Sequence, residues 1–488
     1  MHATSSTATA QRATSQSAKG AAFDLLSSPV WPVGAAQIQM PISPARIAAF
    51  DILVRVETQD AYAGELLHTS VIDRLSSPDR GLTTEIVMGV LRWRSRLDDR
   101  IAKASSRPLA KLDAEVLTAL RIAAYQLSLL TRIPASAAIN ESVELVKRAR
   151  KTSAAPFTNA VLRKLVSAGA MPIAAEFDAT VANIAHEYAH PEWLVERWTR
   201  QFGIETVFQI CRQDQSEPAP SLRFEDAGAE AELKADGINL SPGGILTTAR
   251  MLLGCDVSDL TRTAAFREGR VAIQDEGSQL VALLVGHGSR ILDCCAAPGG
   301  KTAVLAARNP AAEIIAAELH SHRADLLRKR VRAANVKVIQ ADALQLPVEG
   351  NFDRILADVP CSGTGTLARN PEIKWRVTPE DLDDLHNKQV AILRAALGHL
   401  APGGRAIYST CSLEREENES VVLEVLAQQP AQFRLRHVGD ELQGLQASGD
   451  LDREDLDPLV SGKYLRTIPG IHPCDGFFAA IIERSDQN

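Results

Sequence analysis

The feature that most constrains this fold is a change in hydrophobic period near Gln274. From there onward, short apolar runs alternate with amphipathic helical stretches, as in "SRILDCCAAPGGKTAVLAARN", "FDRILADVPCSG" and "RAIYSTCS". Alternating strands and helices of this kind favour a doubly wound, mostly parallel sheet with helices on both faces. We therefore expect a C-terminal α/β domain of Rossmann-like architecture over residues 271–488, with "FRLRHV" and "GFFAAIIERS" as its last strand pair.

The preceding part of the chain follows other patterns. From Ser43 to Ala168, apolar residues recur at spacings of three and four, which predicts an all-helical domain over residues 43–170. Its first helix opens with "SPARIAAFDILVRV", a Ser cap followed by a Pro in the first turn. Residues 171–270 combine one amphipathic helix with short strand candidates between Gly and Pro residues, which predicts a small α/β connector.

Residues 1–42 are expected to form a disordered tail, because they are rich in Ala, Ser, Thr and Gln. They contain Arg12 and Lys19 but no acidic residue before Asp24, so an organellar transit peptide is an alternative interpretation. A start at Met40 is a further alternative, since patterned sequence begins just after it.

Composition narrows the classes of function. The net charge of −7 argues against a general nucleic-acid binder, although it leaves room for a local basic surface. Seven cysteines without paired CxxC spacings indicate a reduced, cytoplasmic protein with no structural zinc. No apolar run is long enough to cross a membrane, and we expect a monomer with no metal. The acidic stretch over residues 440–457 is predicted to be a solvated loop.

Polar and nucleophilic side chains follow the ends of successive predicted strands. In doubly wound sheets, ligands bind outside the carboxyl ends of the strands, so these side chains are expected to meet at one edge. In strand order they are Asp293 to Lys301, Glu318, Asp342, Asp358 with Cys361, and Cys411.

The turn after the first of these strands predicts a pocket for a nucleoside-containing cofactor. Gly299 and Gly300 let the backbone approach a ligand, and the following helix directs its N-terminus at that ligand. A P-loop is disfavoured because Cys295 stands where its first Gly is required. Glu318 would accept hydrogen bonds from a ribose diol, and Asp342 would meet an adenine edge. The cofactor would be S-adenosylmethionine or a dinucleotide, and the missing GxGxxG turn disfavours the dinucleotide. The turn comprises Cys295, Ala296, Ala297, Pro298, Gly299, Gly300 and Lys301.

Cys361 and Cys411 lie among Pro, Ser, Thr and Gly residues, a setting that suits a reactive thiolate. Two thiols and an acid beside a methyl donor are the groups that methylation of carbon 5 of cytosine requires. Carbon 5 of cytosine becomes nucleophilic enough to take a methyl group when a thiolate adds to carbon 6 and an acid stabilises the adduct near N3. Either cysteine suits the attack, and the residues alone do not rank them.

Three motifs, "CAAPGGK", "DVPCSGTG" and "STCSLEREENE", together resemble those of the Nol/Nop/Sun family of RNA cytosine-5 methyltransferases. Nearer the N-terminus, "GVLRW", "LRIAAYQL", "RIPASAAINESVEL" and "FTNAVLRK" resemble the NusB-like RNA-binding domain of the bacterial Sun-type (Fmu) enzymes. The resemblance covers residues 43–488. It implies a class I S-adenosylmethionine-dependent methyltransferase domain and methylation of carbon 5 of a cytosine in 16S rRNA, through a covalent cysteine–carbon 6 adduct.

The resemblance also implies a role for each residue. Cys411 would be the nucleophile, Cys361 would assist release of the product, and Asp358 would contact the cytosine and line the cofactor site. Lys301 would support the active site. DNA cytosine-5 methyltransferases use a cysteine placed as Cys361 is, so the choice of Cys411 rests on the resemblance. The cofactor would be held by the turn from Cys295 to Lys301 together with Glu318, Asp342 and Asp358.

The substrate is expected to be a single-stranded or loop cytosine, because the base must leave its stack to react. Basic segments at "HRADLLRKRVRAANVK", "LVKRARK" and "LRWRSR" are candidate RNA contacts, or alternatively solvated helix faces. The connector segment also departs from relatives at "SLRFED", which bears on RNA contacts around Arg223. Trp375 would stack on RNA or pack in the core. A tRNA methyltransferase of the same family and a non-catalytic NusB-like antitermination factor are the alternative functions.

Overall fold

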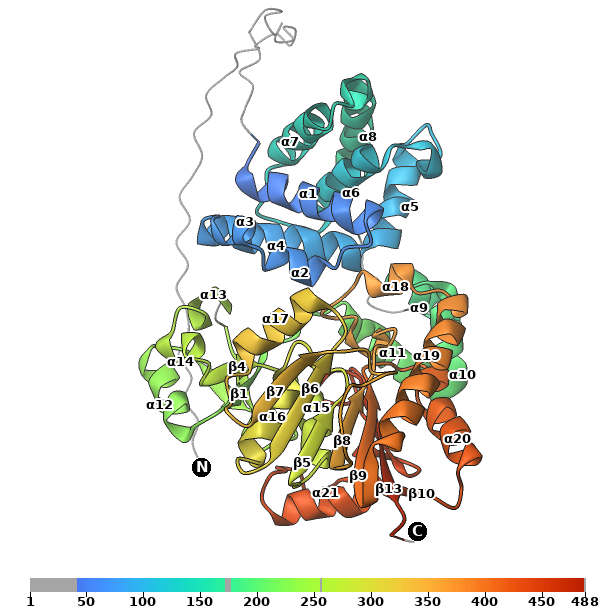
Figure 1. Cartoon of the computed structure of the whole chain (residues 1–488). Coiled ribbons are helices and arrows are strands. Elements are labelled where there is room, and N and C mark those ends of the chain that lie inside the picture. The colour runs from blue at the N-terminus through green and yellow to red at the C-terminus, as the bar shows by residue number, and fades with distance from the viewer. Residues whose placement is uncertain (1–41, 172–176, 255–256, 487–488) are drawn as a thin grey trace, which may run out of the picture. The chain divides into compact units, whose positions relative to one another are not determined.

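The computed structural model describes residues 42–171, 177–254 and 257–486. The alternative transit peptide, the alternative start at Met40 and all of the predicted tail except Ile42 fall within residues 1–41, outside the described residues. The described chain begins with a run of helices (Figure 1). They are α1 (Pro44–Thr58), α2 (Ala63–Leu67), α3 (Ser70–Asp73), α4 (Ser77–Arg92), α5 (Arg94–Ala104), α6 (Ala114–Leu129), α7 (Ala135–Arg148) and α8 (Ala155–Ser167).

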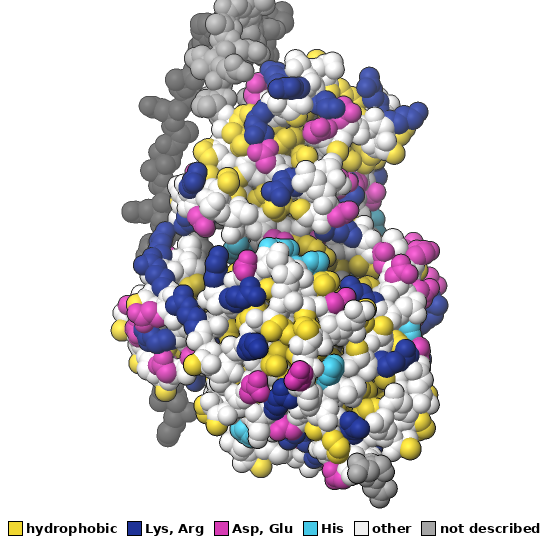
Figure 2. Space-filling view, in the orientation of Figure 1, with side chains coloured by type: hydrophobic (Ala, Val, Ile, Leu, Met, Phe, Trp, Pro, Cys, Tyr) yellow, Lys and Arg dark blue, Asp and Glu magenta, His cyan; other side chains and the backbone are white. Residues whose placement is uncertain are grey.

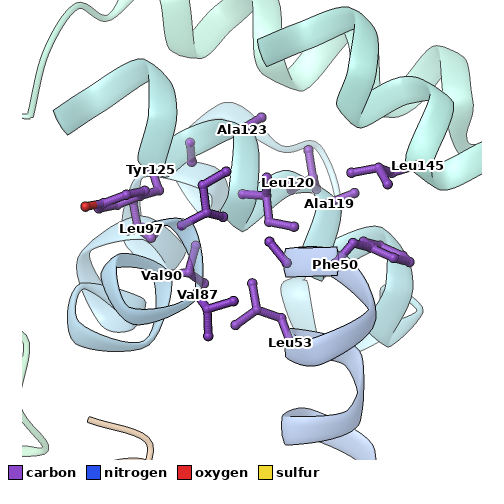
Figure 3. Close-up of a cluster of buried hydrophobic side chains, with 14 of the residues drawn as sticks. Phe50, Leu53, Val87, Val90, Leu97, Ala119, Leu120, Ala123, Tyr125 and Leu145 are labelled. Carbon is purple, nitrogen blue, oxygen red and sulfur yellow. The ribbon is translucent and has the colours of Figure 1, made fainter. Parts of the chain in front are cut away.

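These helices share one apolar core, in which α6 is central. Leu120 of α6 is fully buried, and Figure 3 shows it between Phe50 of α1, Val90 of α4 and Leu145 of α7. Gly89 lets α4 approach α6, since a Cβ atom there would lie 2.0 Å from Cζ of Tyr125. The predicted all-helical N-terminal domain is therefore confirmed.

The middle segment starts with three helices, α9 (Val181–Glu187), α10 (Glu192–Phe202) and α11 (Ile204–Asp214). Within the described residues, a small antiparallel sheet follows, with strand order β2-β3-β1-β4. Its strands are β1 (Ser221–Phe224), β2 (Leu240–Pro242), β3 (Arg250–Leu252) and β4 (Val271–Ile273), with helices α12 (Ala227–Ala235), α13 (Val257–Leu260) and α14 (Ala264–Arg267). Arg223 lies buried in β1 and donates from Nε to Oε1 of Gln274 at 2.8 Å, so it faces the protein interior and not an RNA surface.

The C-terminal part is the predicted α/β unit. Its main sheet has the order β11-β12-β13-β9-β8-β5-β6-β7 over the described residues, with β10 paired to β13. The pairs among β5 to β9 are parallel, and those that involve β10 to β13 are antiparallel. The strands are β5 (Arg290–Asp293), β6 (Glu313–Glu318), β7 (Val336–Gln340), β8 (Phe352–Asp358), β9 (Leu400–Thr410), β10 (Phe433–Arg436), β11 (Val460–Ser461), β12 (Tyr464–Arg466) and β13 (Phe478–Arg484).

Helices cover both faces of this sheet because successive strand residues point to opposite sides. Ile291 and Ile407 pack with α15, α16 and α21, whereas their neighbours Leu292 and Ala406 pack with α19 and α20. Figure 1 shows these layers. The helices are α15 (Glu276–Leu284), α16 (Gly300–Arg308), α17 (Ser321–Arg330), α18 (Ile373–Arg376), α19 (Pro379–Gly398), α20 (Glu419–Gln428) and α21 (Val438–Ala447).

Two expectations about surface segments are wrong. The stretch predicted as a solvated loop contains much of α21, whose Val438, Leu442 and Leu445 are buried at helical spacing. In "LRWRSR", Arg92 and Arg96 are buried and act in packing rather than as an open basic face. Arg92 Nη2 donates to the carbonyl of Ala368 at 2.9 Å.

The short helix α18 connects the catalytic sheet to the N-terminal helices. Trp375 is half-buried, and its Nε1 donates to the carbonyl of Leu91 at 2.7 Å. Arg376 Nη2 donates to the carbonyl of Val56 at 2.9 Å, and Glu372 accepts from the amide of Ala63 at 2.8 Å. Trp375 therefore takes part in the packing of this junction.

Candidate functional site

The candidate site lies where the strand order changes direction. From β5 the chain continues to β6 and β7 on one side, and β8 and β9 lie on the other. Such a switch point leaves a crevice at the carboxyl ends of the two central strands, where doubly wound proteins bind ligands. The turn from Cys295 to Lys301 follows β5, and Asp358 ends β8.

The turn after β5 is shaped by its glycines. Gly299 has a φ of 107°, a left-handed value that favours glycine, and α16 begins at Gly300. A Cβ atom on Gly299 would lie 2.8 Å from Cδ1 of Leu327 and from Cγ2 of Val331. Gly299 is therefore required by backbone conformation and by the close packing of α17, whatever ligand the turn holds. Arg323 of α17 supports the turn by donating from Nη2 to the carbonyl of Ala297 at 3.1 Å.

Lys301 and Asp358 form an ion pair in the crevice, with Nζ and Oδ2 2.8 Å apart. Ser409 of β9 donates its hydroxyl to Oδ1 of Asp358 at 2.8 Å, which fixes the other carboxylate oxygen. Burial alone lowers the pKa of Lys301, but the Asp358 carboxylate and, more weakly, Cys411 raise it above its usual value. Lys301 therefore stays a cation that faces both Asp358 and Cys411.

Cys361 and Cys411 meet beside this ion pair. Their Sγ atoms lie 3.4 Å apart, and both side chains are half-buried. The hydrogen bond to Cys411, together with burial and the charges of Cys411 and Glu417, raises the pKa of the Cys361 thiol well above its usual value. Burial and these neighbours therefore favour the protonated form of Cys361.

The predicted cofactor acids lie further along the same sheet edge. Glu318 ends β6 with its side chain buried, and its Oε1 accepts from the amide of His320 at 2.9 Å. Its Oε2 accepts no hydrogen bond from the described residues, and the guanidinium Nε of Arg323 lies 3.9 Å away. Asp342 follows β7, is exposed, and accepts from the amide of Leu344 at 2.9 Å. Lys301, Asp358, Cys361 and Cys411 thus form one cluster, with the two acids on the neighbouring strands.

Comparison with known proteins shows the family of this chain. Residues 280–483 match the family described as 16S rRNA methyltransferase RsmB/F, and residues 43–167 match the NusB family. A probable ribosomal RNA small subunit methyltransferase B of Bacillus subtilis is 32% identical over 454 residues, which cover 90% of this chain and 98% of the relative. The chain belongs to the RsmB/F family of rRNA methyltransferases.

Another relative supports the RsmB/F assignment, and two solved structures show the same fold. A ribosomal RNA small subunit methyltransferase B of Pseudomonas putida is 34% identical over 409 residues, or 79% of this chain and 89% of the relative. The crystal structure of PH0851 superposes with a TM-score of 0.74 at 24% identity and covers 91% of this chain and 99% of its own. NSun6 of Pyrococcus horikoshii, solved with SFG, has a TM-score of 0.51 at 22% identity and covers 61% of this chain and 99% of its own. The predicted fold class is confirmed.

Several residues of this RsmB/F site were not singled out from the sequence. Ser409, Ser362, Ser412 and Glu417 all lie within or beside the recognised motifs, so their proximity to the cysteines was the available signal. Phe477 has no such signal, because it precedes the antiparallel strand β13 outside those motifs, yet Nζ of Lys301 lies 5.2 Å from its ring centroid. Among the helices that the structure describes, none is long and apolar enough to cross a membrane.

Proposed function

We propose that this chain methylates carbon 5 of a cytosine in 16S rRNA through a covalent adduct between Cys411 and carbon 6 of the base. The observation that carries the proposal is the 3.4 Å approach of Cys361 and Cys411 beside the Lys301–Asp358 ion pair. Membership of a 16S rRNA methyltransferase family supports both the proposed rRNA substrate and a cytoplasmic location. A non-catalytic antitermination factor loses support because the family is enzymatic. A tRNA methyltransferase loses support because the relatives from Bacillus subtilis and Pseudomonas putida are named for rRNA.

The residues at the strand ends fit S-adenosylmethionine. Glu318 offers Oε2 as an acceptor for a ribose diol, since only Oε1 is used by the amide of His320. Asp342 is exposed on the next strand, in a position to meet an adenine edge. The turn from Cys295 to Lys301 would hold the rest of the S-adenosylmethionine molecule with its backbone. S-adenosylmethionine supplies an electrophilic methyl group, and the use of this donor is expected of a methyltransferase of this family.

The surroundings of the two thiols support a separate role for each. A thiolate is the nucleophilic form of cysteine, and a nearby cation favours it. Cys411 attacks carbon 6 of the cytosine, as the resemblance to the Nol/Nop/Sun family implies, and the Lys301 cation interacts with it. Asp358, held by Lys301 and Ser409, contacts the ring and stabilises the adduct near N3. Carbon 5 then carries the electron pair that accepts the methyl group.

Cys361 acts when the product leaves. A base then takes the proton from carbon 5, the electron pair of that C–H bond forms the double bond between carbons 5 and 6, and the bond from carbon 6 to Sγ of Cys411 breaks with its electron pair returning to the sulfur. Cys361 is protonated and lies within hydrogen-bond distance, so it stabilises the departing thiolate. This role is the one that the resemblance to the Nol/Nop/Sun family implies for Cys361.

Exposed cations of α17 and the following turn are the proposed RNA contacts. Arg328, Lys329, Arg330 and Arg332 are exposed, although Arg328 is paired with Asp325 at 2.7 Å. Lys and Arg side chains are interspersed with apolar and acidic ones on the face shown in Figure 2. A local basic strip on an acidic protein suits a structured RNA whose phosphates approach at one place.

Bisulfite sequencing of 16S rRNA and tRNA from a deletion strain tests this proposal. A 16S cytosine that is protected in the parent should be converted in the deletion strain. Protection should return with the wild-type gene and not with the Cys411→Ala gene. Loss of protection at a tRNA cytosine alone would contradict the rRNA substrate.

A further inference from the structure

A buried carboxylate joins the two cysteine loops. Glu417 is fully buried at the end of a short helical turn, and its Oε1 accepts from the amide of Ser362 at 2.7 Å and from Nε2 of Gln389 at 2.9 Å. Its Oε2 accepts from the hydroxyls of Ser362 and Ser412. Ser362 directly follows Cys361, and Ser412 directly follows Cys411. One carboxylate therefore accepts hydrogen bonds from the residue after each cysteine.

Further hydrogen bonds hold the two cysteine loops together. The hydroxyls of Ser362 and Ser412 lie 3.1 Å apart, and the amide of Gly365 donates to the carbonyl of Cys411 at 2.9 Å. Tyr408 donates its hydroxyl to the carbonyl of Glu417 at 2.5 Å, which anchors the turn to β9. The carboxylate is therefore itself held in place while it holds the two loops.

We propose that Glu417 is a positioning residue of the methyl transfer, because its carboxylate fixes the Cys361 loop against the Cys411 loop and thereby sets the separation of the two thiols. The inference rests on the proposed function for its catalytic consequence only. The thiol separation itself is a property of the folded chain and can be measured without RNA or S-adenosylmethionine. A misplacement of about 1 Å at a reacting group is enough to lower a rate by roughly 100-fold.

The hydrogen-bond pattern distinguishes two substitutions at this position. Oε1 faces two N–H groups that can only donate, whereas Oε2 faces two hydroxyls that can rotate and accept. In Glu417→Gln the amide oxygen can replace Oε1 and accept from the two N–H groups. The amide nitrogen can replace Oε2 and donate to the two hydroxyls, so the loops stay joined. In Glu417→Ala the four donors lose their common acceptor. Glu416 lies in the same turn but pairs with Arg197, so Glu416→Gln is a matched control.

Diamide oxidation measures the thiol separation directly. This azo compound removes one hydrogen from each thiol and becomes a hydrazine, which leaves a disulfide between Cys361 and Cys411. We would follow that disulfide by peptide mass spectrometry in the full-length protein without substrate. The wild type, Glu416→Gln and Glu417→Gln should cross-link within about twofold of one another, and Glu417→Ala about tenfold more slowly.

Steady-state kinetics give the second measurement. Glu417→Ala should lower kcat by about tenfold or more with the KM for S-adenosylmethionine within about twofold, and Glu417→Gln should recover most of the rate. Wild-type cross-linking in Glu417→Ala, or an equal loss in Glu416→Gln, would overturn the proposal. If Glu417→Ala does not fold, the Ser362→Ala/Ser412→Ala double variant takes its place, and unchanged cross-linking there overturns the proposal equally. Absence of cytosine methylation in the wild type would refute the proposed function and leave the cross-linking result standing.

Discussion

The Sγ atoms of Cys361 and Cys411 lie 3.4 Å apart, although the residues are 50 positions apart in the chain. Each thiol follows the carboxyl end of one of two paired parallel strands, β8 and β9. At this distance both sulfurs can reach one atom of a substrate, but their surroundings differ, because burial and its neighbours raise the pKa of Cys361 well above its usual value. This difference gives each cysteine its own expected phenotype.

Cys361→Ala should accumulate a covalent complex with RNA, because Cys411 can still attack and its release is impaired. Cys411→Ala should be inactive and form no complex. A denaturing gel of protein incubated with labelled RNA and S-adenosylmethionine separates the two results. An adduct in Cys411→Ala and none in Cys361→Ala would reverse the assignment.

Lys301→Met should lower kcat by about 100-fold, since it removes the positioned cation that faces both Asp358 and Cys411. Lys234→Met is a matched control, because Lys234 is an exposed cation paired with Glu230. Methyl transfer to 16S rRNA from labelled S-adenosylmethionine gives both rates. Equal activity of Lys301→Met and the control would remove Lys301 from the mechanism.

Glu318→Ala should weaken the binding of S-adenosylmethionine by about 10- to 100-fold, the usual cost of losing a hydrogen bond to a charged group. Isothermal calorimetry measures the affinity directly. Asp325→Ala serves as the control, since Asp325 is exposed and pairs with Arg328 on α17. An unchanged affinity in Glu318→Ala would count against the ribose contact.

Asp293→Asn should change how stability depends on pH. Burial, with a contribution from the charge of Asp358, raises the pKa of Asp293 from 3.8 to about 7, against the opposing effect of the hydrogen bond from Thr302. Between these values the folded protein keeps a proton that the unfolded chain has lost. The contribution of Asp293 to the free energy of unfolding therefore falls as pH rises through this window.

The asparagine variant does not titrate at this position. The free energy of unfolding of the variant minus that of the wild type should therefore rise by up to about 4 kcal/mol between about pH 4 and pH 8. Urea unfolding of both proteins across this range measures the difference. Parallel pH profiles would show that Asp293 is ionised throughout. Other titrating groups are common to both proteins and cancel in the comparison.

Much of this architecture could be predicted from local pattern. The helical period over residues 43–168 and the alternation after Gln274 both correspond to observed elements. The α21 helix was missed because Asp and Glu residues surround its three buried apolar positions, so charge masked the helical period. The basic segment around Arg92 was misread for a related reason, since the sequence does not show which arginines another part of the chain will cover.

The sequence by itself determined which elements form and which chemical groups stand at the strand ends, because side-chain period and turn residues act over a few positions. Only the tertiary structure decided which of those groups meet. The parallel register of β8 and β9 sets Asp358 opposite Ser409, and the cysteines that follow each strand then converge. Glu417 joins their loops through Ser362 and Ser412. Strand register and buried hydrogen bonds are long-range relations, and they exist only once the sheet has closed.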